Sequence, residues 1–371
     1  MNNEDSDDYI EDVAAVDVDQ DDGVDVESRY NDILSVLATE TNVQQIERIE
    51  CPSPLEFYRE YVAQNKPVII KNAFNNWKAL KLWSIEYLRN KMKDTEVTVA
   101  VTPDGLGDAI KRSTKDGKEY FVKPLEKKIP FSQYLDTLEH LPRDDGTSNV
   151  HYLQYQNGSF NLEFEALWQD IDHAAINFAK EAFGMEPEAV NFWMGEDRAI
   201  SSLHKDPYEN IYCVVKGTKV FTLLPPTDYP FLYETEFPAA TYVEAADNPA
   251  RLEMRTDDPP ERVPWIPVDP AKDYSVNCHR YPQVERAHPL HVEVHEGEIL
   301  YLPSLYYHRV AQRGDHEHKT IAINYWFDMR YGPNHVYYQF IRQFNAAKPL
   351  PSVDVAASSK SSKSVETGSQ E

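Results

Sequence analysis

Two stretches decide the predicted fold of this chain: Ser201-Ser202-Leu203-His204-Lys205-Asp206 and Leu302-Pro303-Ser304-Leu305-Tyr306-Tyr307-His308. In a strand, alternate side chains point to the same face, so His204 and Asp206 share one face. Two imidazoles and one carboxylate inside a β-barrel can occupy one face of an iron ion and leave positions open for a co-substrate and oxygen. A His-x-Asp triplet alone is usually solvated surface. Here the run Gly297–Pro303 predicts a turn and a strand that deliver His308 as a third ligand, which makes a metal centre the stronger interpretation.

The sequence around these stretches is rich in short aromatic and β-branched runs. The predicted strands are 151–156, 189–194, 211–215, 219–224, 291–294 and 299–302, separated by turn residues. This spacing is typical of an antiparallel barrel or jelly roll rather than of alternating βα units. The predicted fold class is therefore mainly β with flanking helices, a double-stranded β-helix.

Helical patterns flank the predicted barrel on both sides. Apolar stripes at helical spacing predict helices near residues 30–37, 54–62, 77–88 and 336–344, and β-branched runs predict strands at 66–71 and 96–101. The predicted organisation is a disordered acidic tail (1–28), an α/β region packed on the barrel (29–145), the barrel (146–330) with an insertion (227–290), a C-terminal helix (331–350) and a disordered tail (351–371). The insertion holds ten prolines, and a loop of that length is more often functional than idle.

The chain is strongly acidic, with 62 Asp and Glu against 37 Lys and Arg and a formal net charge of −25. Affinity for nucleic-acid phosphates comes mainly from clustered Lys and Arg, so direct binding to nucleic acid is not expected. Residues 1–28 alone hold twelve acids and no Lys or Arg. Residues 227–300 hold fifteen acids against six bases, which suits a rim that receives a lysine-bearing protein, although a solvated acidic loop would have the same composition.

Three scattered cysteines suit neither a disulfide framework nor a zinc finger. No run approaches the roughly 20 apolar residues of a membrane span, and the N-terminus lacks the cations and apolar core of a signal peptide. We therefore expect a soluble protein with no membrane partner, located in the cytoplasm, with the nucleus as a second location.

Lys219 lies on the predicted strand that follows the His-x-Asp stretch. A lysine among Val220, Phe221 and Leu223 usually points to the outer face of a strand. If it pointed inward, its burial would be costly unless an anion paired with it. A dicarboxylate co-substrate would be such an anion.

Taken together, these motifs resemble the JmjC-domain Fe(II)- and 2-oxoglutarate-dependent oxygenases, and among them most closely the lysyl hydroxylase subgroup. The resemblance covers roughly residues 45–345. The matching stretches are 54–61, 65–71, 83–88, 99–105, 191–196, 202–213, 263–270, 297–303 and 324–331. The stretch Val263-Pro264-Trp265-Ile266-Pro267 lies outside the catalytic core and separates this subgroup from other JmjC proteins.

The resemblance also implies roles for individual residues. His204, Asp206 and His308 would bind Fe(II), and Lys219 would pair with the distal carboxylate of 2-oxoglutarate. Tyr152 would donate a hydroxyl hydrogen bond to the same carboxylate, and Asn210 and Asn324 would line the pocket. Ser201 stands where the family usually has threonine, and Tyr307 would form an aromatic wall of the pocket. Tyr152 and Asn324 would otherwise make ordinary hydrogen bonds in the core.

The activity implied by the resemblance consumes O2 and 2-oxoglutarate and releases succinate and carbon dioxide. Its product is a lysine hydroxylated at C3 in a partner protein, and the resemblance implies a developmentally regulated GTP-binding protein as that partner. The C-terminal helix resembles a homodimerisation element, and it could equally pack against its own barrel. Two other enzymatic readings stay open, a histone lysine demethylase and a histone-tail peptidase. The non-enzymatic alternative is a cupin-like binding or scaffold protein. That alternative is disfavoured because the expected site residues are all present: His204, Asp206, His308 and Lys219.

Overall fold

The computed structural model describes residues 26–41, 43–139, 148–272 and 274–346, so most of the acidic N-terminal tail and all of the serine-rich C-terminal tail lie outside the described residues. The chain divides after Thr41 into two compact units. The first contains helix α1 (Val26–Thr41). This helix begins at Val26, two residues before the predicted end of the acidic tail at residue 28.

The second unit is built on two sheets that form the predicted jelly roll. In the described residues the larger sheet has nine strands in the order β1-β2-β17-β11-β19-β9-β8-β3-β7. These are β1 (Glu47–Glu50), β2 (Val68–Lys71), β17 (Ile299–Leu302), β11 (Tyr208–Lys216), β19 (Thr320–Asp328), β9 (Ala189–Gly195), β8 (Val150–Leu153), β3 (Glu96–Thr102) and β7 (Leu125–Pro130).

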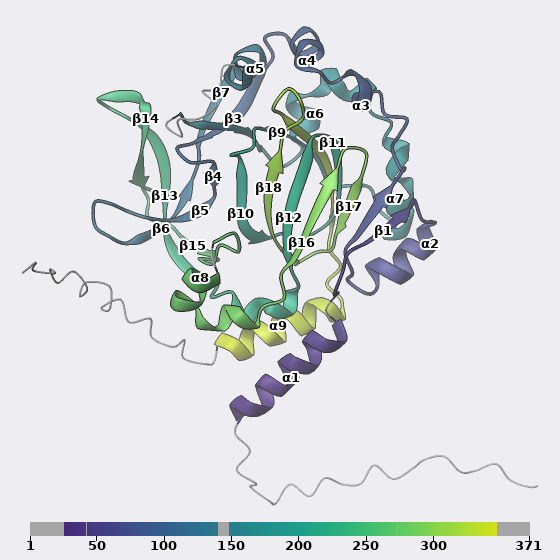
Figure 1. Cartoon of the computed structure of the whole chain (residues 1–371), viewed down its shortest axis with the longest axis vertical. Coiled ribbons are helices and arrows are strands. Elements are labelled where there is room, and N and C mark those ends of the chain that lie inside the picture. Colours follow the sequence, from purple (N-terminus) through teal and green to yellow (C-terminus); the bar gives the residue numbers. More distant parts are fainter. Residues whose placement is uncertain (1–25, 42, 140–147, 273, 347–371) are drawn as a thin grey trace, which may run out of the picture. The chain divides into compact units, whose positions relative to one another are not determined.

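The smaller barrel sheet has five strands in the described residues, in the order β16-β12-β18-β10-β4. Figure 1 shows four of them side by side across the middle of the unit. The strands are β16 (Leu290–His295), β12 (Thr218–Leu224), β18 (Tyr307–Arg313), β10 (Ile200–Lys205) and β4 (Leu106–Gly107). The prediction of a mainly β fold with flanking helices is confirmed, although β10, β18 and β19 were not among the strands that the apolar runs identified.

Side-chain alternation on the strands builds two separate cores. On β11, Ile211 and Cys213 point to a core that the larger sheet shares with the helices, whereas Tyr212 and Val214 point into the barrel. The barrel core also contains Phe221 from the opposite sheet. Both faces of the larger sheet are therefore buried, which explains why its strands are apolar throughout instead of alternating with polar residues.

The helices that cover the larger sheet come mostly from the N-terminal part of the chain. They are α2 (Pro54–Phe57), continued by the π-helix η1 (Tyr58–Val62), α3 (Ala79–Leu82), α4 (Ile85–Met92), α5 (Phe131–Glu139), α6 (Ser159–Glu163), η2 (Glu165–Asp170), η3 (His173–Ile176) and α7 (Asn177–Phe183). Large aromatic side chains such as Trp77, Trp83 and Phe160 fill the space beneath them. Within the described residues, no helix is long and apolar enough to cross a membrane.

A third sheet joins the predicted insertion to the N-terminal region. It contains β14 (Asn248–Thr256), β13 (Thr235–Ala245), β6 (Glu119–Lys123) and β5 (Ala109–Arg112), and β15 (Arg262–Trp265) pairs with β13. In Figure 1 this sheet stands at the left, beside β10 and β4. The insertion therefore contributes three strands to this part of the fold, and β13 pairs with β6, more than a hundred positions upstream.

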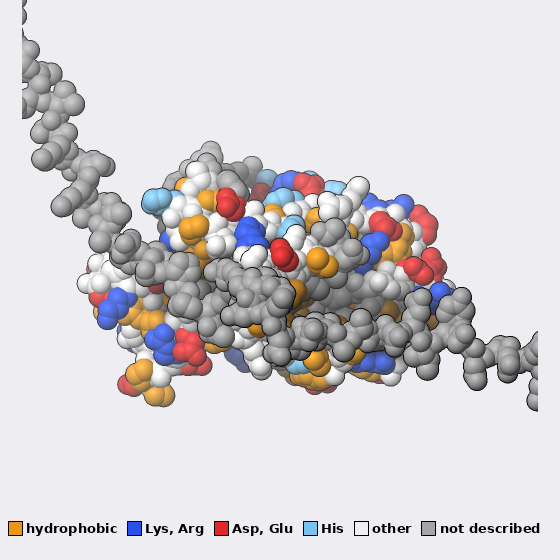
Figure 2. All heavy atoms as spheres, turned by 90° about the horizontal axis from the view of Figure 1, so that it is seen from below, with side chains coloured by type: hydrophobic (Ala, Val, Ile, Leu, Met, Phe, Trp, Pro, Cys, Tyr) orange, Lys and Arg blue, Asp and Glu red, His pale blue; other side chains and the backbone are white. Residues whose placement is uncertain are grey.

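The other elements of the insertion and the C-terminal helix lie at the lower end of the barrel in Figure 1. They are η4 (Pro226–Phe231), α8 (Tyr274–Arg280), η5 (Pro282–Arg286) and α9 (Pro333–Ala346). On the face shown in Figure 2, acidic, basic and apolar side chains of the described residues are interspersed. No side of that face is therefore dominated by charge of one sign among the described residues.

Candidate metal centre

Three side chains predicted to bind metal meet at the end of β10 and the start of β18. His204 and His308 face each other directly in the register of these two strands, and Asp206 follows the last residue of β10. The Asp206 Oδ2 atom is 3.8 Å from His204 Nε2 and 3.5 Å from His308 Nε2. One ligand atom from each residue lies within 4.8 Å of the others. Two imidazole nitrogens and a carboxylate on one side of a point form the donor set of a non-haem Fe(II) site.

Backbone carbonyls orient both imidazole rings. Nδ1 of His204 lies 2.7 Å from the Ser202 carbonyl oxygen, and Nδ1 of His308 lies 3.0 Å from that of Tyr306. Each Nδ1 therefore carries the proton and donates it, which leaves the Nε2 lone pairs directed toward Asp206. Burial, followed by the electrostatic effect of the neighbouring His308 ring, lowers the pKa of His204 to about 4, so the His204 ring is in the neutral form that binds metal.

The turn that delivers His308 is tied to the segment that carries Asp206. The N–H of Leu305, a residue with φ of 65°, donates to the Asp206 carbonyl oxygen at 3.0 Å. Glu209 accepts hydrogen bonds from the Ser304 hydroxyl at 2.8 Å, the Ser304 N–H at 3.2 Å and the Tyr301 hydroxyl at 2.8 Å. These contacts fix the turn although a non-glycine residue with positive φ is costly.

The prediction that the run at 297–303 delivers His308 is only partly right. That run contains β17, which belongs to the larger sheet, whereas His308 lies on the next strand, β18, in the opposite sheet. The sequence could not show this because a four-residue turn between two short apolar runs looks like a continuation of one strand.

Lys219 points into the barrel and is fully buried, contrary to the usual orientation of a lysine in an apolar strand. It shares the inward face of β12 with Phe221 and Leu223. Its ammonium lies 3.1 Å from the Tyr152 hydroxyl and also donates to the Gln312 side-chain oxygen. Both partners are neutral, and no carboxylate among the described residues forms an ion pair with it. Burial lowers the pKa of Lys219 to about 7. A buried cation with only neutral partners fits a bound anion.

Gln312 was missed by the sequence reasoning, although a signal for it existed. Gln312 lies four residues after His308 on β18, so strand alternation places both side chains on the inward face. Its amide nitrogen donates to the Glu196 carbonyl oxygen at 2.6 Å, and its amide oxygen accepts from Lys219. This chain of hydrogen bonds holds the lysine at the inner end of the barrel.

The predicted asparagines and Ser201 line an inner chamber beside the metal ligands. Asn324 donates from its amide to the Asn210 side-chain oxygen at 3.1 Å, and it accepts from the Trp193 indole at 2.8 Å. The chamber is also lined by Tyr152 and by the three metal-ligand residues. The structure therefore brings Ser201, Asn210, Asn324 and Tyr152 to one chamber, with Lys219 in contact with the Tyr152 hydroxyl.

Tyr307 is not part of the chamber wall, and its prediction as an aromatic wall is wrong. It is the neighbour of His308 on β18, so it points to the opposite face of the strand. Its hydroxyl lies 3.1 Å from the Tyr338 hydroxyl of α9. This residue therefore connects the barrel to the C-terminal helix.

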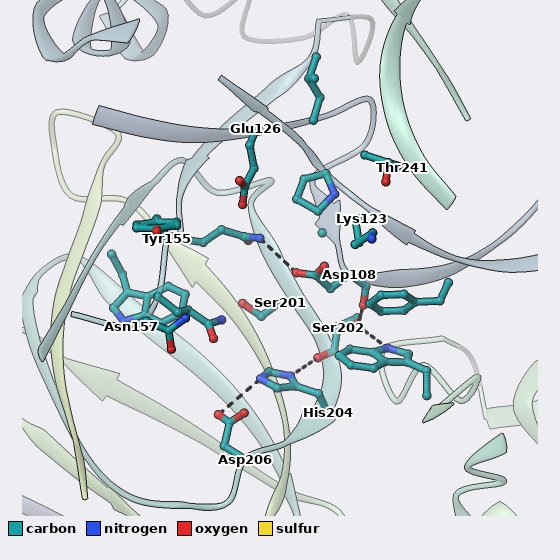
Figure 3. A pocket seen from close by; sticks show the side chains of 18 of the residues that line it. Asp108, Lys123, Glu126, Tyr155, Asn157, Ser201, Ser202, His204, Asp206 and Thr241 are labelled. Atoms are coloured by element: carbon teal, nitrogen blue, oxygen red, sulfur yellow. Dashed lines mark hydrogen bonds and ion pairs between the residues drawn. The ribbon is translucent and has the colours of Figure 1, made fainter. Parts of the chain in front are cut away.

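A larger cleft of about 770 Å³ opens next to the chamber, and His204, Asp206, Ser201 and Trp193 belong to the walls of both. The insertion contributes Trp265, whose ring is parallel to that of His204 with centroids 6.1 Å apart. The Trp265 indole also donates to the Ser202 hydroxyl at 3.2 Å. Figure 3 shows His204 and Asp206 at one end of this cleft and Glu126 and Thr241 at the other.

Comparison with known proteins identifies the family. A model of the cupin-like domain matches residues 54–332. JmjC domain-containing protein E of Dictyostelium discoideum is 52% identical over 330 residues, which are 85% of this chain and 94% of that protein. The chain belongs to the cupin-like JmjC family.

Two other relatives of this JmjC protein carry names that state an activity. The human bifunctional peptidase and (3S)-lysyl hydroxylase JMJD7 is 41% identical over 81% of this chain and 89% of its own length. The lysine-specific demethylase JMJ32 of Arabidopsis thaliana is 40% identical over 78% of this chain and 84% of its own length. JmjC enzymes are oxygenases that use Fe(II) and 2-oxoglutarate, and the His-Asp-His triad is present here. The chain is therefore almost equally similar to a protein named as a hydroxylase and to one named as a demethylase.

Proposed function

We propose that this chain is an Fe(II)- and 2-oxoglutarate-dependent oxygenase that hydroxylates a lysine side chain, at C3, in a protein partner. The observation that carries the proposal is the juxtaposition of the triad, in one barrel, with a fully buried lysine whose hydrogen-bond partners are neutral and that forms no ion pair among the described residues. His204, Asp206 and His308 would hold the metal. When bound, the metal and 2-oxoglutarate supply a hydroxyl group from O2 to a substrate carbon, and the co-substrate leaves as succinate and carbon dioxide.

The protein's own contribution is binding, orientation and exclusion of water. Lys219 and the Tyr152 hydroxyl would anchor the distal carboxylate of 2-oxoglutarate, and Gln312 would keep the ammonium in place. A carboxylate beside Lys219 would raise the pKa of its ammonium back toward the ordinary value, so binding should be accompanied by proton uptake near neutral pH.

A protein lysine is the substrate that the cleft supports best. Its walls carry the carboxylates of Asp108 and Glu126 together with the aromatic rings of Trp265 and Phe121. Support also comes from the relative named as a (3S)-lysyl hydroxylase, which matches most of this chain. We propose a developmentally regulated GTP-binding protein as the partner to test first. Lysine demethylation is the second candidate, because a demethylase relative has almost the same identity.

One mass-spectrometric experiment separates these outcomes. The full chain, loaded with Fe(II), 2-oxoglutarate and ascorbate in air, is incubated with the candidate GTP-binding protein and with methylated histone tails. Hydroxylation adds one oxygen to a lysine, demethylation removes a methyl unit, and peptidase activity cleaves the backbone. Reactions without 2-oxoglutarate and reactions with Asp206→Ala are the controls. Loss of a methyl unit with no gain of oxygen would favour the demethylase, and products that form without 2-oxoglutarate would contradict the oxygenase.

We also propose that the chain forms homodimers through α9. The face that carries Tyr338 and Ile341 is buried, whereas Val336, Tyr337 and Phe340 on the same helix are more than half exposed. A helix that packs against its own barrel and also presents apolar side chains outward is suited to a second copy. Sedimentation of the wild type and of Tyr337→Glu tests the proposal. A monomeric wild type would refute it, and conversion of a dimer to a monomer by the substitution would support it.

A further inference from the structure

Asp108 occupies an unusual position at the edge of the barrel. It lies between β4 and β5 with φ of 51°. Strand β4 pairs in parallel with β10, where Gly107 is the partner of Ser201, and the Ser202 hydroxyl donates to the Asp108 carbonyl oxygen at 2.5 Å. In this register Asp108 lies opposite Ser202, which is two residues before His204 on β10. Figure 3 shows its carboxylate in the cleft, beyond Ser201 and Ser202 as seen from Asp206.

Among the described residues the carboxylate of Asp108 forms no ion pair, and the charge of Lys123 acts on it only from beyond ion-pair distance. The Gln154 amide donates to it at 3.3 Å. Gly107 leaves room for that amide, because a Cβ atom there would lie 3.1 Å from the amide nitrogen and oxygen of Gln154. Burial, as the main cause, raises the pKa of Asp108 to about 6. An ionised carboxylate in this place would be stabilised by an incoming cation.

The cations that line the cleft are already paired with other acids. Lys123 lies 2.7 Å from Asp257 and 3.8 Å from Glu261. Lys205 forms an ion pair with Glu234. The exposed Glu126 also lines the cleft and adds a second negative charge on the side of Asp108. Asp108 and Glu126 are therefore cleft carboxylates that form no ion pair among the described residues, whereas both lysines of the cleft already have acidic partners.

Aromatic rings form the wall between the metal ligands and Asp108. The rings of Trp265 and Phe121 are 4.6 Å apart between centroids, and the hydrogen bond from Trp265 to Ser202 fixes the indole beside β10. An apolar wall that ends at a carboxylate suits a side chain with an apolar stem and a cationic head, which is the chemistry of lysine.

We infer that Asp108 binds the ammonium group of the substrate lysine and selects lysine over uncharged side chains. The inference rests on the proposed function, because it assumes that a lysine side chain enters this cleft. Neighbouring strands are about 4.8 Å apart and residues rise about 3.3 Å along a strand, which places the Asp108 backbone roughly 8 Å from that of His204. With its ammonium at Asp108, a lysine turns a carbon of its stem, and not its nitrogen, toward the metal ligands. The arrangement favours C–H hydroxylation over removal of an N-methyl group.

A binding experiment tests this recognition without turnover. Full-length protein loaded with Mn(II) and 2-oxoglutarate is immobilised and offered random-sequence peptides whose central residue is either lysine or norleucine, which has the stem without the ammonium. Asp108→Asn keeps the shape of the side chain, and asparagine tolerates positive φ. Glu244→Gln is the matched control: it removes the same charge from β13 of the neighbouring sheet, where Glu244 is bonded to Lys127 and does not line the cleft.

The wild type and Glu244→Gln should enrich lysine peptides over norleucine peptides about tenfold, the value of one hydrogen bond to a charged group, and Asp108→Asn should abolish the enrichment. If Asp108→Asn does not fold, Asp108→Gly takes its place, since glycine adopts positive φ freely. Equal enrichment by the wild type and the Asp108 variant, or none by the wild type, would overturn the inference. Lysine enrichment without oxygen addition in the mass-spectrometric assay would leave the recognition standing and refute the proposed hydroxylation.

Discussion

Replacing Lys219 with methionine should make the metal-free protein more stable while abolishing 2-oxoglutarate binding. Lys219 is fully buried, its partners Tyr152 and Gln312 are neutral, and burial lowers its pKa to about 7. Methionine fills a similar volume without a charge. A lysine that lowers the stability of the folded protein is expected where its charge is needed to bind a ligand.

The magnitude follows from the pKa. A fall from 10.5 to about 7 corresponds to a folding penalty of about 5 kcal/mol for the protonated lysine. The substitution also removes the donor to the Gln312 oxygen and the contact with the Tyr152 hydroxyl, which costs about 1–3 kcal/mol. The net expectation at pH 7 is a gain of about 2–4 kcal/mol in the free energy of unfolding.

The sign of the pH dependence is specific to a lysine whose pKa is lowered. Below pH 7 the lysine is protonated in both the folded and the unfolded protein, so the full penalty is present. Between pH 7 and 10.5 the unfolded chain holds a proton that the folded protein lacks, and the wild type gains about 1.4 kcal/mol per pH unit relative to the variant. Above pH 10.5 the penalty is absent.

Urea unfolding in the presence of a chelator, at a series of pH values from below 7 to above 10, measures this difference. Lys128→Met, which changes an exposed lysine on β7, is the control and should show no such trend. Calorimetric titration with Mn(II) and 2-oxoglutarate should show binding to the wild type and none to Lys219→Met. A Lys219 variant that is less stable than the wild type at pH 7, or a difference that does not change with pH, would refute the reasoning.

Three further substitutions test the site. Asp206→Ala should abolish succinate production and Mn(II) binding and leave the circular dichroism spectrum intact; undiminished succinate would remove Asp206 from the metal site. Tyr152→Phe should weaken 2-oxoglutarate binding about tenfold through the loss of one hydrogen bond, with little change in Mn(II) affinity, and equal losses of both would point to a disturbed fold instead. Glu209→Ala should cost about 3 kcal/mol of stability by releasing the turn at Ser304, and it should also weaken Mn(II) binding. Unchanged metal affinity in a folded Glu209→Ala protein would show that the turn does not position His308.

Periodicity and residue type predicted the fold class and the residues of the metal centre. Strand alternation placed His204 and Asp206 on one face, and the apolar runs outlined a jelly roll. The same alternation could have identified Gln312 from His308, and it does place Tyr307 on the opposite face. The errors arose where the boundary between two strands had no signal, as in the turn between β17 and β18.

The orientation of Lys219 shows a different limit. Its strand is apolar on both faces, so sequence alone favoured the outer, solvated face for a lysine. The structure buries the inward face of β12, which carries Lys219 with Phe221, whereas Val220 on the outward face is only partly buried. Which face is inward depends on the pairing of β12 with β16 and β18, strands that lie about seventy and ninety residues away.

The sequence by itself determined the chemistry that is available here: two imidazoles, a carboxylate and a lysine on strands of one barrel. This information is local, because alternation along a strand is fixed by backbone geometry. Only the tertiary structure decided how that chemistry is enclosed. It brought β15 of the insertion and β4–β6 of the N-terminal region together as the cleft walls, so that Trp265 lies beside His204 and Asp108 lies in the same cleft. Such contacts depend on the packing of segments that are distant in the sequence, so the periodicity of residues along the chain does not predict them.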